Sequence, residues 1–205
     1  MIDCYTANTP NGVKIPIALE ELGVPYHVVP VNLSASEQKQ PAFMAINPNG
    51  RIPAIVDRDG PGGLPLSVFE SGAILIYLAD KFGKLLPDDP VGRVRALEYL
   101  FFQVGGVGPM FGQALWFMRR SEPVAVAIER YQNESHRLTA VLEIRLSAQP
   151  WLAGAQFSIA DIAHFGWLRV AHRSGVELSG YPAVQRWVDV IARRPAVQRG
   201  LAAVV

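Results

Sequence analysis

The sequence has little material for a disulfide framework or a metal centre. It contains a single cysteine, Cys4, and four histidines that are scattered along the chain. One cysteine cannot form an intramolecular disulfide, and the absence of such disulfides is typical of proteins from a reducing compartment. Cys4 lies in a short predicted strand without a second cysteine nearby, so we expect a buried, unreactive side chain. Because the histidines show no metal-ligand spacing, we expect no bound metal.

Charge of one sign and long apolar runs are equally scarce. Lysine and arginine number 19 against 18 for aspartate and glutamate, which gives a formal net charge of +1. A sequence with this charge balance has no excess of basic residues to attract nucleic acids or anionic membranes. The apolar runs are too short to span a bilayer, and the first residues lack the pattern of a signal peptide. We therefore expect a globular cytoplasmic protein with no nucleic-acid partner and no membrane partner.

The first 82 residues, in contrast, carry clear signals for alternating strands and helices. A strand, a helix and a parallel strand predict a βαβ unit, and two further strands with a helix predict a ββα unit. This order predicts a thioredoxin-like α/β domain over residues 1–82. The predicted elements are, in chain order, strand 2–6, helix 13–22, strand 26–31, a brief helix 41–46, strands that start at Pro53 and Leu66, and helix 71–82.

The remainder of the chain predicts helices only. Residues 83–90 are rich in Gly, Asp and Pro without an apolar period, and we expect a linker there. It separates the first domain from an all-helical domain over residues 91–205. Within this second domain, the glycines and the proline of 105–109 should kink or split a long helix. Ser158 and Asp161 form a capping-box pattern at the start of another helix, and we expect their role to be structural.

The most informative stretch lies between Asn49 and Ile74. Pro53 starts a strand with a residue that has no N–H, and it restricts Ile52 to extended conformations, which leaves the Ile52 backbone available to an outside partner. Ser71 is expected to cap the following helix, whose first N–H groups attract an anion. Glu70 offers a carboxylate to an amine. Together these groups suit a peptide ligand that carries both a free amine and a free acid.

This stretch resembles the glutathione site of the glutathione transferase superfamily. The resemblance rests on Ile52-Pro53 before a strand and on Glu70-Ser71 at a helix start. It implies a cis proline, a preceding residue that binds the cysteinyl backbone of glutathione, and a Glu-Ser pair that holds the γ-glutamyl end. The pattern of Ser158 and Asp161 resembles the buried folding motif of the same superfamily. An ordinary strand-turn-helix with a capping serine is the alternative for the stretch.

The loop before the first helix resembles one particular class. Superfamily members carry a thiol-activating tyrosine, serine or cysteine in this region, whereas this chain has Thr9-Pro10-Asn11-Gly12. Together with Gln38 and Arg51, the loop resembles the bacterial nu-class of glutathione-dependent disulfide-bond reductases, which is related to a fungal nitrogen regulator. We expect Thr9 and Asn11, helped by backbone N–H groups of the loop, to stabilise the glutathione thiolate. Alternatively, Thr9 and Asn11 only form the turn or cap the following helix.

The resemblance continues at residues 102–110 and 127–131. In the nu-class, the arginine that matches Arg130 reaches glutathione in the neighbouring subunit, so the resemblance implies a homodimer with shared sites. A solvated arginine paired with Glu129 or Glu134 is the alternative. The predicted catalytic residues are Thr9 and Asn11, and the predicted glutathione-binding residues are Asn11, Gln38, Arg51, Ile52, Pro53, Glu70, Ser71 and Arg130.

The function implied by the resemblance is reduction of a disulfide, with glutathione as cosubstrate, glutathione disulfide as a bound species and no other cofactor. Two alternatives stay open. One is transferase or peroxidase activity toward a hydrophobic electrophile or a peroxide, because residues 114–118 are more apolar than in the better-known class members. The other is a non-enzymatic, glutathione-binding regulatory dimer.

Overall fold

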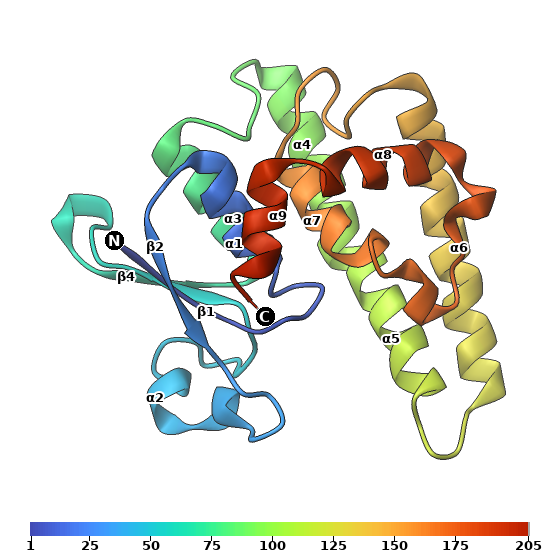
Figure 1. Ribbon diagram of the computed structural model, residues 1–205, viewed down its shortest axis with the longest axis horizontal. Coiled ribbons are helices and arrows are strands. Elements are labelled where there is room, and N and C mark those ends of the chain that lie inside the picture. Colours follow the sequence, from blue (N-terminus) through green and yellow to red (C-terminus); the bar gives the residue numbers. More distant parts are fainter. Residues whose placement is uncertain (205) are drawn as a thin grey trace. The chain divides into compact units, whose positions relative to one another are not determined.

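The computed structural model describes residues 1–204 (Figure 1). Its internal contacts divide the chain into two compact units. Unit 1 comprises Met1–Lys84 together with the segment from Arg193 onward, and unit 2 comprises Leu85–Ala192. The predicted domain limits, with a linker at 83–90, stay a prediction, because compactness alone does not show which segments fold independently.

Unit 1 contains a four-stranded mixed sheet. Its strands are β1 (Ile2–Thr6), β2 (Tyr26–Pro30), β3 (Ala54–Asp57) and β4 (Leu66–Phe69). They lie in the order β2-β1-β3-β4. β1 is parallel to β2, with Cys4 opposite Val28, whereas β3 is antiparallel to both β1 and β4. The predicted βαβ and ββα order is therefore confirmed.

The end of the chain packs against the first helix of unit 1. The helices of this unit are α1 (Lys14–Leu22), α2 (Pro41–Met44), α3 (Ser71–Phe82) and α9 (Pro195–Ala202), with 3₁₀ segments η1 (Glu37–Lys39) and η2 (Pro61–Gly63). In Figure 1 the red α9 lies beside the blue α1. A Cβ at Gly200 would lie 2.7 Å from the backbone of Ile17, so this close approach requires glycine. Arg194 also pairs with Glu21 of α1, at 2.6 Å.

Cys4 lies in the core of unit 1. Its side chain has no exposed area, and burial raises the pKa of its thiol to about 12. The apolar neighbours of this core include Ile15 and Leu19 of α1 and Ile74 and Leu75 of α3, all fully buried. Because a thiol with so high a pKa stays protonated near neutral pH, it is a poor nucleophile. The expected burial of Cys4 is confirmed, and its lack of reactivity stays a prediction.

Unit 2 is helical. Its elements are α4 (Pro90–Phe102), η3 (Gln103–Val107), α5 (Gly108–Met118), α6 (Ala125–Ala148), α7 (Ile159–Leu168), η4 (Ala171–Ser174), η5 (Leu178–Gly180) and α8 (Pro182–Ala192). The predicted irregularity at 105–109 takes the form of a π-helical segment, η3, that joins α4 directly to α5. Pro109 then occupies the first turn of α5, where a missing N–H costs no hydrogen bond within that helix.

Asp161 organises the start of α7. Its carboxylate accepts hydrogen bonds from the Ser158 N–H at 2.9 Å, the Leu152 N–H at 3.0 Å and the Trp187 indole N–H at 2.9 Å. The Ser158 hydroxyl in turn accepts a bond from Ala160 N–H. Asp161 is fully buried, and this burial raises its pKa to about 6. The predicted capping box is confirmed, and it ties α7 to the preceding loop and to α8.

Two kinds of feature are absent from the part of the chain that the structure describes. Among residues 1–204, no helix is both long and apolar enough to cross a membrane. The same residues contain no group of three or more His, Cys, Asp or Glu side chains that could hold a metal ion.

Candidate active site

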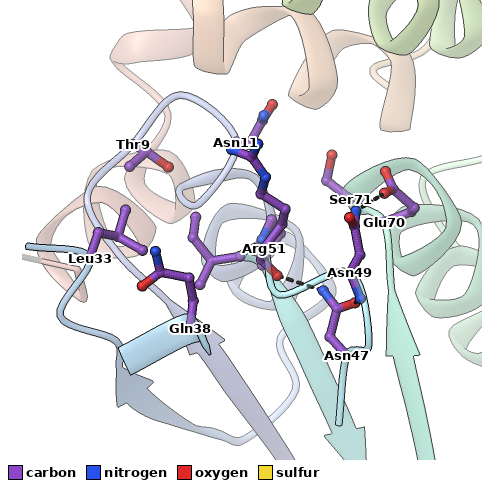
Figure 2. A pocket seen from close by; sticks show the side chains of 11 residues that line it. Thr9, Asn11, Leu33, Gln38, Asn47, Asn49, Arg51, Glu70 and Ser71 are labelled. Atoms are coloured by element: carbon purple, nitrogen blue, oxygen red, sulfur yellow. Dashed lines mark hydrogen bonds between the residues drawn. The ribbon is translucent and has the colours of Figure 1, made fainter. Parts of the chain in front are cut away.

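The candidate active site is a pocket of about 410 Å³ in unit 1. Every predicted site residue of that unit lies around it, although these residues are spread over the first 71 positions of the chain. Figure 2 shows Thr9, Leu33 and Gln38 on one side and Asn49, Glu70 and Ser71 on the other. The lining residues are Thr9, Asn11, Leu33, Gln38, Asn47, Asn49, Arg51, Ile52, Pro53, Glu70 and Ser71.

Between α2 and β3, two asparagines shape the wall of the pocket. The Asn47 side chain is buried, and its Nδ2 donates a 2.6 Å hydrogen bond to the Arg51 carbonyl (Figure 2). Its Oδ1 accepts a 2.9 Å bond from the Asn49 N–H. Both asparagines line the pocket, and neither was among the predicted site residues. The density of asparagine beside Ile52-Pro53 was the available signal.

Ile52 and Pro53 have the arrangement that the resemblance implies. The Ile52–Pro53 peptide bond is cis, which confirms that expectation. β3 begins at the next residue, so Ile52 stands just outside the ladder. Within residues 1–204, the N–H and C=O of Ile52 make no hydrogen bond with other protein groups. The Ile52 backbone can therefore pair with an extended ligand.

Glu70 has an unusual backbone conformation. Its φ of 69° is positive, which a non-glycine residue rarely adopts and which costs free energy. Its carboxylate is exposed at the pocket and accepts a long, 3.4 Å contact from Asn49 Nδ2 (Figure 2). Strained backbone residues cluster at functional sites, where the surrounding structure holds them. The conformation supports a role for Glu70 in the pocket beyond local folding.

Ser71 does not cap α3, so that prediction is wrong. Glu70 occupies the N-cap position, and Ser71 is already the first helical residue. The reason is that α3 starts one residue earlier than a Ser71 cap would require, with Glu70 at the N-cap and a positive φ there. The Ser71 hydroxyl instead accepts a 3.3 Å hydrogen bond from Nζ of Lys14. The first-turn N–H groups of α3 still have no acceptor within their own helix, and the helix dipole favours an anion there.

The loop between β1 and α1 is closed by its own hydrogen bonds. The Thr9 N–H donates to the Ala7 carbonyl at 2.7 Å, and the Gly12 N–H donates to Thr9 Oγ1 at 2.9 Å. A Cβ at Gly12 would lie 2.0 Å from the Ala7 carbonyl oxygen, so the loop requires glycine there. These two N–H groups are therefore not available to a thiolate, and the predicted help from them is wrong.

Thr9 both closes this turn and faces the pocket. Its oxygen accepts the Gly12 bond, while its hydroxyl hydrogen can still be donated to another group. The Asn11 side chain lines the same pocket and carries an amide donor. The side chains of Thr9 and Asn11 are thus two donors of this loop that can stabilise an anion in the pocket.

Gln38 presents an acceptor to the pocket. Its Oε1 is buried, yet it has no hydrogen-bond partner within residues 1–204. Buried side-chain acceptors are normally satisfied, so such an atom in a pocket wall calls for a ligand or water donor. Arg51, also on the pocket wall, adds an exposed cation that suits a carboxylate.

Arg130 is not part of this pocket. It lies on α6 of unit 2, beside a separate hollow of about 900 Å³ that Glu134 and Arg137 also line. Arg137 Nη2 pairs with Glu134 at 2.7 Å, whereas Arg130 forms no ion pair within residues 1–204. A close ion pair of Arg130 with Glu129 or Glu134 is therefore not formed in the described residues, although the Arg130 charge contributes, after the Arg137 hydrogen bond, to lowering the pKa of Glu134.

The two-unit fold and a pocket that suits a short peptide define the class of protein, and family models agree. The model "Glutathione S-transferase, N-terminal domain" matches residues 3–80, and "Glutathione S-transferase, C-terminal domain" matches residues 109–195. The chain belongs to the glutathione S-transferase family. It is similar to the disulfide-bond oxidoreductase YfcG of Escherichia coli (strain K12), with 48% identity over 203 residues, which cover 98% of this chain and 94% of that relative.

Solved structures give the same result. A glutathione transferase from Burkholderia graminis, described with two glutathione molecules bound per protein subunit, has a TM-score of 0.93 and 46% identity, covering 98% of this chain and 87% of that chain. A glutathione transferase from Pseudomonas putida, described with one glutathione disulfide bound per protein subunit, has a TM-score of 0.91 and 43% identity, covering 98% and 90%. The predicted superfamily and its two-part fold are confirmed.

Proposed function

We propose that this protein is a glutathione-dependent disulfide reductase. One observation carries the proposal: a single pocket gathers Thr9 and Asn11 with the Ile52–Pro53 cis peptide and the Glu70-Ser71 pair. These are the groups that a tripeptide thiol with a free amine and two carboxylates requires. The similarity to YfcG, a protein named as a disulfide-bond oxidoreductase, supports the choice of reaction.

Glutathione would span the pocket from one side to the other. Glu70 would bind the γ-glutamyl amine, and Ser71 with the first turn of α3 would bind the neighbouring carboxylate. The Ile52 backbone would pair with the cysteinyl residue. On the opposite side, Gln38 Oε1 would accept an amide N–H, and the Arg51 guanidinium would bind the glycyl carboxylate. Thr9 and Asn11 would then face the sulfur, where a hydroxyl and an amide can donate to a thiolate.

The reaction proceeds by two thiol–disulfide exchanges. The bound glutathione thiolate attacks one sulfur of a disulfide RSSR, forms a mixed disulfide GSSR and expels RS⁻, which takes up a proton. A second glutathione thiolate attacks the glutathione sulfur of GSSR, giving GSSG and a second RSH. The net change is 2 GSH + RSSR → GSSG + 2 RSH. The protein contributes positioning and thiolate stabilisation, and no protein atom forms a covalent bond.

The relatives of known structure support a site that serves both steps. One is described with two glutathione molecules per subunit and another with one glutathione disulfide per subunit. Two exchanges consume two glutathione molecules, for which the first relative's site has room, and glutathione disulfide is the product of the second exchange. A panel of glutathione-dependent assays with 2-hydroxyethyl disulfide, cumene hydroperoxide and 1-chloro-2,4-dinitrobenzene tests the proposal. We expect the disulfide to give the highest kcat/KM, and a highest value for either other substrate would contradict it.

Transfer of glutathione to an apolar electrophile is the second candidate. The segment Ala114–Met118 favours it, because Trp116 has 54% of its surface exposed. Its ring packs edge-to-face against that of Phe117, with 4.7 Å between the ring centroids. Exposed aromatic side chains can bind apolar substrates. In the assay panel this candidate predicts that the aryl chloride is the preferred substrate. Failure of all three substrates, with glutathione still bound, would favour a regulatory dimer without turnover.

Replacing Cys4 by serine should leave disulfide reductase activity within about twofold of the wild type. In the proposed mechanism glutathione supplies both sulfurs that attack, and burial keeps the Cys4 thiol protonated with a pKa of about 12. The measurement is kcat/KM for the small disulfide, with circular dichroism to verify the fold. Loss of activity in a folded variant would mean that Cys4 is itself a nucleophile.

We also propose a homodimer in which Arg130 reaches the glutathione site of the partner subunit. Arg130 has no ion-pair partner within its own described chain, and a guanidinium can bind a carboxylate through two hydrogen bonds. Arg130→Ala should weaken glutathione binding about tenfold without lowering the melting temperature. Arg137→Ala is the matched control, since Arg137 lies on the same helix and already pairs with Glu134.

Mixed dimers test the shared site directly. A dimer of one Arg130→Ala subunit and one Glu70→Ala subunit has one site with both residues intact and one site with neither. Mixing the two variants should therefore restore some of the binding that each lacks alone. A monomer by light scattering, or no recovery on mixing, would exclude the shared-site arrangement.

A further inference from the structure

A lysine lies buried directly behind the pocket wall. Lys14 is the first residue of α1, and it has only 1% of its surface exposed. It does not line the pocket, but its Nζ donates a 3.3 Å hydrogen bond to Oγ of Ser71, which does. Burying an ammonium group is costly even when it is hydrogen-bonded, and a lysine is seldom fully buried. No step of the proposed reaction uses this cation.

We propose that Lys14 is a positioning residue that prepares the pocket for the carboxylate of the γ-glutamyl group. This inference rests on the proposed function, because it concerns how the same site binds glutathione. Lys14 acts through Ser71 and through its buried positive charge, without touching the ligand.

The geometry fixes the direction of the Ser71 hydroxyl. While Lys14 is charged, its ammonium group can only donate hydrogen bonds, so the Ser71 oxygen accepts the bond from Lys14. The hydrogen of that hydroxyl then has to point elsewhere, and it has no acceptor within residues 1–204. Since Ser71 lines the pocket, the hydroxyl is oriented to donate to an anion there. The first-turn N–H groups of α3 reinforce this preference.

The charge of Lys14 is tied to that of the pocket. Burial lowers the pKa of Lys14 to about 7, and the negative charge of Glu70 acts against this lowering. The other charged groups on the packed elements are engaged elsewhere. On α1, Glu20 and Glu21 pair with Arg199 and Arg194 of the C-terminal segment. Lys81 of α3 pairs with Asp57 of β3, and Asp3 of β1 pairs with Arg58. Asp80 of α3 also has an interaction partner.

The sign of the pH effect follows from this coupling. A carboxylate bound near Lys14 stabilises the charged ammonium, so the pKa of Lys14 is higher in the complex than in the unliganded protein. Between these two pKa values, binding takes up a proton. Affinity is therefore greatest below about pH 7, where Lys14 is already charged, and it falls as the pH rises through the pKa of the unliganded protein.

Calorimetry with S-methylglutathione tests the inference, because this ligand has no thiol whose ionisation would obscure the signal. Titrations at pH 7.5 in buffers of different ionisation enthalpy should show uptake of about half a proton by the wild type. Lys14→Met should abolish this uptake, weaken binding about tenfold and leave the thermal stability at least as high, since it removes a buried charge. Lys84→Met, which removes an exposed lysine away from the pocket, should behave like the wild type.

Two further measurements separate the possible outcomes. Between pH 6 and pH 8.5, the affinity of the wild type for S-methylglutathione should fall about tenfold relative to the affinity of Lys14→Met. In a double-mutant cycle, the loss of affinity caused by Lys14→Met should be smaller when Ser71 is already alanine. The wild type alone can also decide the matter if Lys14→Met does not fold. If its binding takes up no proton and its affinity does not depend on pH, the role of Lys14 is wrong while the proposed function stands. No binding of S-methylglutathione at millimolar concentration would overturn both.

Discussion

Replacing Asn11 by alanine is expected to lower the kcat of disulfide reduction about 10- to 1000-fold, because removal of one donor to a developing anion costs up to about 1000-fold. Asn11 lines the pocket on the loop before α1, and the backbone N–H groups of Thr9 and Gly12 are already used inside that loop. The side chains of Thr9 and Asn11 are therefore the donors that this prediction tests. The pKa of bound glutathione, followed by thiolate absorbance near 240 nm, should rise in the variant by about one to three units.

Thr9 provides the matched control for this prediction. Thr9→Ser keeps the hydroxyl that accepts the Gly12 N–H bond, whereas Thr9→Val keeps the shape and removes the hydroxyl. We expect near-normal turnover for the serine variant and a loss comparable to that of Asn11→Ala for the valine variant. Unchanged thiol pKa values in both Asn11→Ala and Thr9→Val would show that neither side chain stabilises the thiolate.

Replacing Glu70 by alanine is expected to weaken glutathione binding about 10- to 100-fold, because a hydrogen bond to a charged group contributes about 1.5–3 kcal/mol. The positive φ of Glu70 holds its carboxylate at the pocket, where it suits the γ-glutamyl amine. Glutathione should raise the melting temperature of the wild type by preferential binding to the folded state. The Glu70→Ala variant should lose most of this increase.

An acidic residue outside the pocket serves as the control. Glu37 lies on η1, and its carboxylate accepts a bond from the Asn32 N–H without lining the pocket. Glu37→Ala removes the same charge and should keep the full effect of glutathione on the melting temperature. If Glu70→Ala also keeps it, the γ-glutamyl amine is bound by another group and the proposed orientation of glutathione is wrong.

Local patterns in the sequence were sufficient for the fold, and the family resemblance added the residues of the pocket. The order of strands and helices follows from short-range periodicity, and Ile52-Pro53 and Glu70-Ser71 lie at element boundaries that turn and cap chemistry marks. Such signals depend on neighbours a few residues apart, so they survive without tertiary information. The predicted cytoplasmic location, by contrast, came from composition alone and stays a prediction.

Only the tertiary structure decided which distant groups meet. The local pattern makes Ser71 a helix cap, but the backbone of Glu70 and a lysine 57 positions earlier give its hydroxyl a different partner. Lys14 resembles an ordinary helix lysine in the sequence, because burial and a partner on another helix leave no local trace. The packing of α9 against α1 is equally long-range. The sequence by itself determined the elements and the chemistry they carry, whereas packing between elements determined which charges are buried and where each hydroxyl points.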